Sequence, residues 1–126
     1  MKKLILLILV LFSSTILSAQ TFLRASALTF GLKSETTGIT TWDEPEKVNI
    51  LIKVEENKVT IYSKTTQVYR KINLTGKAET IAIWYCSDLN GNNCNLTMFT
   101  AADTPGAIFL HVEYSDAEWM YITRIE

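Results

Sequence analysis

The chain of 126 residues contains one histidine and two cysteines, and its charges nearly cancel, with 12 basic against 13 acidic residues. This balance excludes the strongly basic surface on which nucleic-acid binding depends. A lone histidine acts as a general base only with a positioned partner, and no Gly-x-Ser-x-Gly or Cys-x-x-Cys motif is present. After Gln20 no stretch keeps the i, i+3, i+4, i+7 spacing of an amphipathic helix.

The one long hydrophobic run lies at the start of the chain. Residues 1–3 are Met-Lys-Lys, residues 4–12 are all apolar, and a run of small and polar residues then leads to Ala19. This is the pattern of a signal peptide, so we predict cleavage after Ala19 and a single secreted or periplasmic domain, residues 20–126. Because the run breaks at Ser13, short of the roughly 20 residues of a spanning helix, we expect no stable membrane span after leader removal.

Hydrophobic and polar residues alternate through most of the mature chain, as in Val48-Asn49-Ile50. Such alternation is typical of half-buried strands, and the short connections favour antiparallel neighbours. The pattern predicts an all-β domain of about eight mostly antiparallel strands, built as a small sandwich or a flattened barrel. The strands are expected near residues 22–33, 47–55, 58–64, 67–73, 79–87, 94–100, 107–114 and 119–125. The polar stretch 34–46 is expected to cross or cover one end of the sheet.

Two hairpins allow the strand register to be predicted. A two-residue loop between the second and third strands sets Val54 opposite Val59, which places their apolar side chains on one face. A four-residue loop at residues 115–118 sets Tyr114 against Trp119. Both registers keep the large apolar side chains together on one side of the sheet.

The two cysteines bracket a third hairpin turn. Asp88 suits the first position of a type I turn, and Gly91 suits the left-handed position that ends a three-residue loop. This turn sets Cys86 directly opposite Cys94, within the Cα range of a disulfide. Because export leads to an oxidising compartment, we predict a Cys86–Cys94 disulfide. Residues 88–93 lack the spacing of a calcium-binding loop, so no metal or cofactor is expected.

The sequence offers few candidate site residues. His111 alternates with apolar residues in an expected strand, which favours a structural or surface role. Trp42, Asp43, Glu44 and Glu46 form a loop cluster in which carboxylates stand beside an aromatic ring. Such a cluster is a candidate for binding or cleaving a sugar, although acidic loop residues are also common on solvated surfaces. No catalytic residue is predicted.

The sequence does not identify the function. Export, the all-β pattern, the many aromatic residues and the missing catalytic motif favour a non-enzymatic binding or interaction module, whose partner is another envelope protein or a glycan. One alternative is a carrier of a small apolar ligand in a closed barrel, which requires an interior cavity. Another is a hydrolase, which requires at least two of Asp43, Glu44, Glu46 and His111 in one cleft. An outer-membrane barrel is disfavoured by the lysine and arginine residues within the strands.

Overall fold

The structure is a computed structural model that describes residues 20–126, so the predicted signal peptide, residues 1–19, lies outside the described residues. The described part of the chain consists of strands and connections, without a helix long and apolar enough to cross a membrane. The strands are β1 (Thr21–Lys33), β2 (Thr40–Trp42), β3 (Glu46–Val54), β4 (Lys58–Tyr62), β5 (Gln67–Ala78), β6 (Ile81–Ser87), β7 (Asn93–Phe99), β8 (Ile108–Glu113) and β9 (Ala117–Ile125).

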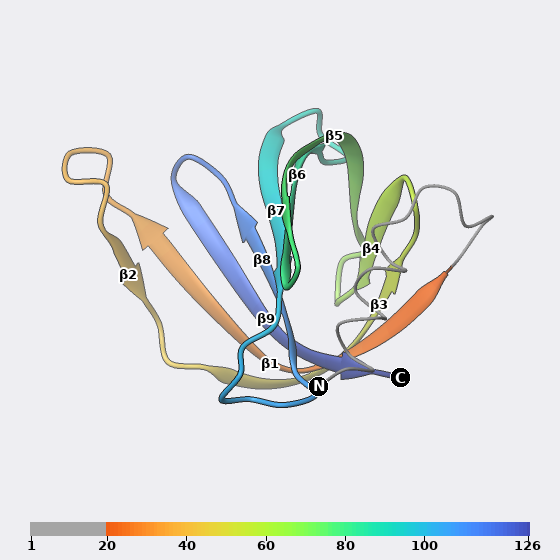
Figure 1. The fold of residues 1–126 in the computed structure, drawn as a ribbon. Helices are drawn as coiled ribbons and strands as arrows, with labels where there is room; N and C mark the ends of the chain where they lie inside the picture. Colours follow the sequence, from red (N-terminus) through yellow and green to blue (C-terminus); the bar gives the residue numbers. More distant parts are fainter. Residues whose placement is uncertain (1–19) are drawn as a thin grey trace.

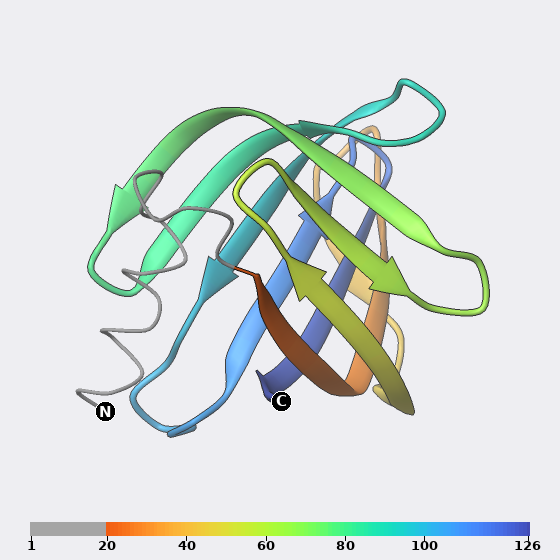
Figure 2. The ribbon, with the colours of Figure 1, turned by 90° about the vertical axis from the view of Figure 1, so that its right-hand side faces the viewer.

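Eight of the strands close into an antiparallel barrel (Figures 1 and 2). The sheet order is β1-β3-β4-β5-β6-β7-β8-β9, and β9 pairs back onto β1. Closure depends on the long first strand, which pairs with β3 on one side and β9 on the other, with a bulge between Ala25 and Ala27. The predicted all-β, antiparallel class is confirmed, and a barrel rather than a sandwich is formed because pairing of the first and last strands removes the free edges.

The polar stretch 34–46 differs from its prediction, because part of it is a ninth strand. Residues 34–39 form a hairpin loop in which Gly38 adopts a φ of 72° and donates its backbone N–H to the Ser34 carbonyl at 2.9 Å. β2 then pairs with the end of β1. β3 pairs with the earlier part of β1, and the interruption between the two strands contains Pro45, which has no N–H to donate to a ladder.

The predicted opposition of Val54 and Val59 is confirmed, and Cys86 lies directly opposite Cys94 as predicted. The two cysteines are nevertheless buried free thiols, so the predicted disulfide is not present in the structure. The backbone N–H of Asp88 donates to the Asn92 carbonyl, so these two residues form a hydrogen-bonded pair of the ladder. Cys86 and Cys94 lie two residues further along and form the next hydrogen-bonded pair, in which the Cα atoms are farther apart than in a non-hydrogen-bonded pair. Burial also raises the pKa of Cys86 to about 12 and of Cys94 to about 11, which disfavours the thiolate that oxidation requires.

The predicted register of the last hairpin is wrong by two residues. Tyr114 donates its backbone N–H to the Ala117 carbonyl at 2.8 Å, and Trp119 pairs with Val112. The loop is therefore the two residues 115–116, Ser and Asp, both of which favour tight turns. A shift of two residues preserves the faces of the strands, so Trp119 still points toward the barrel interior.

β5 is longer than predicted and extends to Ala78 instead of residue 73. Its ladder with β6 contains two register shifts, one between Lys71 and Asn73 and one between Leu74 and Gly76. Each bulge interrupts the alternation of inward and outward side chains. The strand therefore lacks the period of two by which it would be recognised in the sequence.

The barrel interior is occupied by one cluster of buried side chains to which all eight barrel strands contribute. Ile52, Ile61 and Trp84 are 0%, 0% and 6% exposed. Ile50 and Ile83 are half-buried. The centre of the barrel is thus a packed core, which leaves space for a ligand only toward the ends of the barrel.

Gly31 is required where β2 meets β1. A Cβ atom at this position would lie 2.6 Å from Cγ2 of Thr40 and 2.9 Å from Cε3 of Trp42. We expect Gly31→Ala to lower the free energy of unfolding by about 1–3 kcal/mol, as overpacking does, when measured by urea denaturation. Gly76→Ala is the control, because its new Cβ would meet only the flexible Ile83 side chain at 3.3 Å. Equal losses in both variants would contradict the tight contact between β1 and β2.

Candidate functional site

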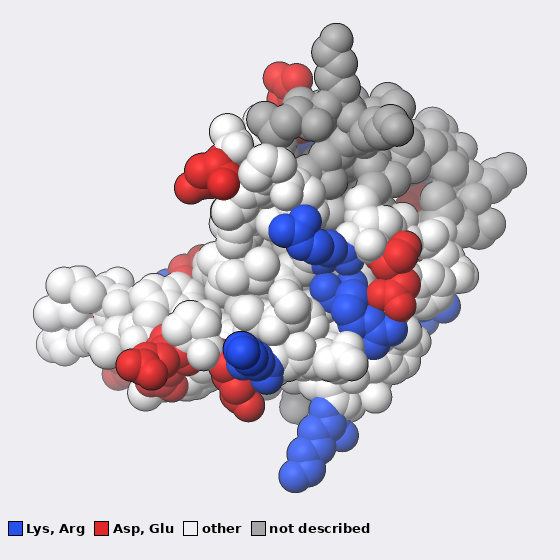
Figure 3. Space-filling view, turned by 90° about the horizontal axis from the view of Figure 1, so that it is seen from below, with Lys and Arg blue, Asp and Glu red and all other residues white. Residues whose placement is uncertain are grey.

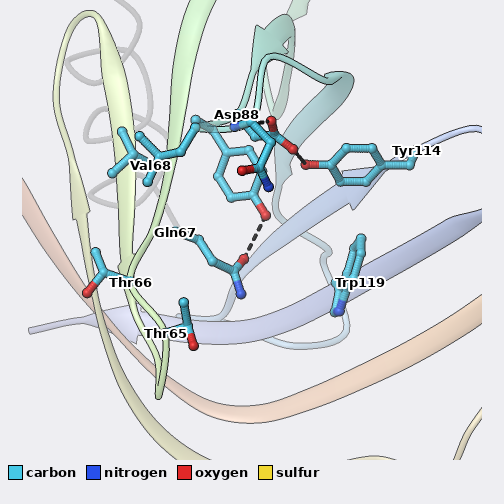
Figure 4. Close-up of a pocket in the computed structure, with 10 residues that line it drawn as sticks. Thr65, Thr66, Gln67, Val68, Asp88, Tyr114 and Trp119 are labelled. Atoms are coloured by element: carbon cyan, nitrogen blue, oxygen red, sulfur yellow. Dashed lines mark hydrogen bonds between the residues drawn. The ribbon is translucent and has the colours of Figure 1, made fainter.

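A pocket of about 300 Å³, the mouth pocket, opens at one end of the barrel, where three connections meet. These are the loop between β4 and β5, the loop between β6 and β7, and the turn between β8 and β9. Figure 4 shows the side chains from these connections around a common opening. The pocket is lined by Thr65, Thr66, Gln67, Val68, Tyr69, Asp88, Leu89, Asn90, Tyr114 and Trp119.

Aromatic rings form much of the pocket wall. Trp119 lies between the rings of Phe30 and Tyr114, with centroid distances of 5.3 Å and 5.5 Å and edge-on geometry in both cases. Phe30 is its direct cross-strand partner on β1. Tyr69, which is 4% exposed, belongs to the buried core and also reaches the pocket. Edge-on packing of this kind holds an indole ring in one orientation, so the wall is formed before any ligand arrives.

Asp88 is held in place by three hydrogen bonds. Its Oδ1 accepts the backbone N–H groups of Asn90 and Asn92, both at 2.9 Å, and its Oδ2 accepts the Tyr114 hydroxyl at 2.7 Å. The bond from Tyr114 is the main reason that the pKa of Asp88 lies below its usual value. The carboxylate is therefore ionised at neutral pH. Burial and the Asp88 carboxylate together raise the pKa of Tyr114.

Gln67 lies across the opening from Tyr114 and Trp119 (Figure 4), and Gln67 and Tyr69 supply further polar groups to the lining. The Tyr69 hydroxyl donates to Oε1 of Gln67 at 2.7 Å, and burial raises the pKa of Tyr69. With Asp88, Asn90 and Tyr114, these residues give the lining one carboxylate, two side-chain amides and two phenol groups, beside the hydroxyls of Thr65 and Thr66. No lysine, arginine or histidine is among the described residues that line the pocket.

Asp88→Asn should make stability less dependent on pH. Because the pKa of the folded carboxyl is depressed, its contribution is present above the unfolded value of about 3.9 and is lost as pH falls through the folded value. We expect the variant to be about 1 kcal/mol less stable than wild type at pH 7, with the difference shrinking at pH 3, in urea denaturation at both pH values. Asp116→Asn, an exposed turn residue, is the control. A difference that stays constant with pH would contradict the role given to the charge.

The loop residues singled out from the sequence lie elsewhere. Trp42, Asp43, Glu44 and Glu46 are exposed on β2, the connection after it and the start of β3, and none of them lines the mouth pocket. The Trp42 ring lies 6.3 Å from the His111 ring. Within residues 20–126, no hydrogen bond or ion pair joins the three carboxylates to His111. The structure does not bring the acidic cluster together with the histidine.

His111 has a partner that the sequence did not reveal. Its Nε2 lies 2.7 Å from Oε1 of Glu118, and the hydroxyl of Thr40 donates to the other carboxylate oxygen of Glu118. Only the corrected register of the last hairpin places Glu118 in a strand, so no local pattern signals this contact. The arrangement orients a histidine but positions no nucleophile against it, because the Thr40 hydroxyl is bonded to the carboxylate.

Charged residues also line two other hollows of similar volume, one of about 310 Å³ with Lys33 and Glu113 and one of about 280 Å³ with Arg70 and Asp88. Lys and Arg side chains form a band across one face, with acidic side chains beside it (Figure 3). On the outside of β1 and β3, Arg24 pairs with Glu126 at 2.8 Å and Lys53 with Glu55 at 3.5 Å. The Arg24–Glu126 pair is open to solvent, which screens it, whereas Lys53 and Glu55 are half-buried. Among the residues that the structure describes, no group of three or more His, Cys, Asp or Glu side chains is placed to hold a metal ion.

Comparisons of the chain with protein-family models, with characterised proteins and with solved structures found no significant match.

Proposed function

We propose that the protein is an exported, non-enzymatic binding module and that its ligand site is the mouth pocket between the three connections. The observation that carries this proposal is the convergence of Asp88, Gln67 and three aromatic rings on one opening. A few polar groups set among apolar and aromatic walls are typical of small-molecule sites. The filled centre of the barrel supports the pocket wall rather than enclosing the ligand.

The size of the pocket limits the ligand. A volume of about 300 Å³ lies at the lower end of the range for small-molecule sites. The ligand is therefore a single ring, a small ion or one terminal group of a larger molecule. The loop residues Thr65 and Thr66 at the rim leave the pocket open to solvent, which suits a group presented from outside.

The two alternatives predicted from the sequence have less support. A carrier of an apolar ligand needs an interior cavity, whereas buried side chains such as Ile52 and Ile61 fill the centre of the barrel. A hydrolase needs Asp43, Glu44 or Glu46 beside another catalytic group, and these residues are exposed away from the pocket. Neither alternative has an observation that favours it over binding at the mouth.

Blocking the pocket tests the proposed function. We expect a panel of small sugars, amino acids and amines, screened by saturation-transfer NMR, to contain binders to the wild-type protein. Thr66→Trp places a large ring at the pocket rim and should abolish that binding. Thr104→Trp is the matched control, because Thr104 is exposed on the β7–β8 connection at the opposite end of the barrel. If binders are found and Thr66→Trp leaves them unaffected, the mouth pocket is not the site.

Export has its own test. Expression of the full-length chain in a bacterium with a periplasm should yield a protein whose intact mass begins at Gln20. Retention of residues 1–19 in the exported fraction, or absence of the protein from that fraction, would contradict the cleaved leader. The same spectrum reads the state of Cys86 and Cys94, since a disulfide would remove two hydrogens from the mass.

A further inference from the structure

We infer that the mouth pocket selects a small organic ammonium ion, such as a quaternary amine. This inference rests on the proposed function and specifies the chemical class of the ligand. It follows from the charge of the lining and from the kind of rings that surround it.

The charge of the pocket favours a cation. Asp88 is the single charged residue among those lining the pocket, and within residues 20–126 no lysine or arginine forms an ion pair with it. Its three hydrogen bonds come from neutral groups, two backbone amides and the Tyr114 hydroxyl. These bonds fix the carboxylate in position without cancelling its charge. An anionic ligand would meet this charge with no basic residue in the lining, since Arg70 lines the adjoining hollow and not this pocket.

The aromatic wall favours the same ligand. Tyr69, Tyr114 and Trp119 all line the pocket, and Figure 4 shows Tyr114 and Trp119 on the side of the opening opposite Gln67. The faces of aromatic rings carry partial negative charge and attract an ammonium group, with tryptophan the strongest of them. Proteins recognise quaternary ammonium groups with such sets of aromatic rings.

The alkyl surface of such an ion also fits the rest of the lining. Val68 and Leu89 contribute apolar surface beside the rings. The methyl groups of a quaternary amine need no hydrogen-bond partner, and the phenol oxygens of the two tyrosines already use their hydrogens on Gln67 and Asp88. A neutral sugar would instead depend on the hydroxyl and amide groups of Thr65, Thr66 and Asn90 to replace its bonds to water.

The test compares choline with 3,3-dimethylbutan-1-ol, a neutral molecule of the same shape, by calorimetric titration of the purified protein made from the full-length chain. We expect choline to bind at least about tenfold more tightly, the factor that a desolvated cation–π contact and a nearby carboxylate supply. Asp88→Asn and Trp119→Leu should each weaken choline binding by about fivefold to tenfold and leave the neutral isostere nearly unchanged. Asp116→Asn and Trp42→Leu are the matched controls, because both residues are exposed and neither lines the pocket.

A gain-of-function variant covers the case in which a loss variant fails to fold. Gln67→Glu adds a second carboxylate to the lining and keeps an oxygen for the Tyr69 hydroxyl, so it should tighten choline binding severalfold. Equal binding of choline and its neutral isostere would overturn the ammonium inference while leaving a pocket that binds. The inference would also be overturned if the protein binds a neutral sugar but not choline, and if Thr66→Trp abolishes that sugar binding. Absence of any pocket-dependent binding would overturn both the inference and the proposed function.

Discussion

Replacing Tyr121 with alanine should lower the free energy of unfolding by about 3–5 kcal/mol. Tyr121 is 1% exposed and lies on β9, the strand that closes the barrel. It pairs with Leu28 on β1 and with Leu110 on β8, so its ring fills the core at the seam between the first and last strands. Since a domain of this size is stable by about 5–15 kcal/mol, the loss should be evident in urea denaturation followed by circular dichroism.

The conservative variant provides the control for Tyr121. Tyr121→Phe keeps the ring and removes only the hydroxyl, so it should cost about 1 kcal/mol or less. If Tyr121→Ala is as stable as Tyr121→Phe, the ring does not fill the core at the closing strand. The pairing of β9 with β1 would then need another explanation.

Glu118→Ala should destabilise the protein by about 3 kcal/mol, because it removes the common acceptor of two hydrogen bonds. Glu118 is 6% exposed, and its carboxylate accepts the Thr40 hydroxyl and lies 2.7 Å from Nε2 of His111. Its direct cross-strand neighbour is Glu113, a like charge that Lys33 offsets through an ion pair of 2.5 Å. Hydrogen exchange at β2 should also accelerate in the variant, since Thr40 loses its bond to the barrel.

The charge of Glu118 makes the stability of the protein depend on pH. Burial opposes ionisation, but the hydrogen bonds from Thr40 and His111 outweigh it and hold the pKa of Glu118 below its usual value. The resulting stability is present above the unfolded pKa of about 4.3 and is lost as pH falls through the folded value. The melting temperature of Glu118→Gln should therefore lie below that of wild type at pH 7 and approach it near pH 3. A deficit that grows as pH falls would contradict this assignment.

Local patterns in the sequence predicted most of the strands and two of the hairpin registers. Alternating residues near Ile52 and Ile61 and the turn residues Asp88 and Gly91 were sufficient, because each signal lies within one hairpin. Closure of the barrel was left open, since it depends on pairing between Leu28 and Tyr121, at the two ends of the mature chain. β2 and the end of β5 were missed because proline and bulges interrupt the period of two.

The candidate site was harder to predict than the fold. Asp88 was recognised for its place in a turn, and Tyr114 and Trp119 were recognised as aromatic strand residues. Their meeting with Gln67 depends on three connections separated by 20 or more residues along the chain. The acidic residues of the loop cluster at residues 42–46 are close together in sequence, which made them candidates, yet none of them lines the pocket.

Intermolecular nuclear Overhauser effects test the mouth site most directly. With choline added to the protein, the methyl protons of the ligand should show contacts to the ring protons of Tyr69, Tyr114 and Trp119. These residues line one pocket but come from β5, from the turn after β8 and from β9. Contacts instead to the exposed Trp42 ring, or to core residues such as Leu110, would place the ligand outside the barrel or within it and would contradict a binding site at the mouth.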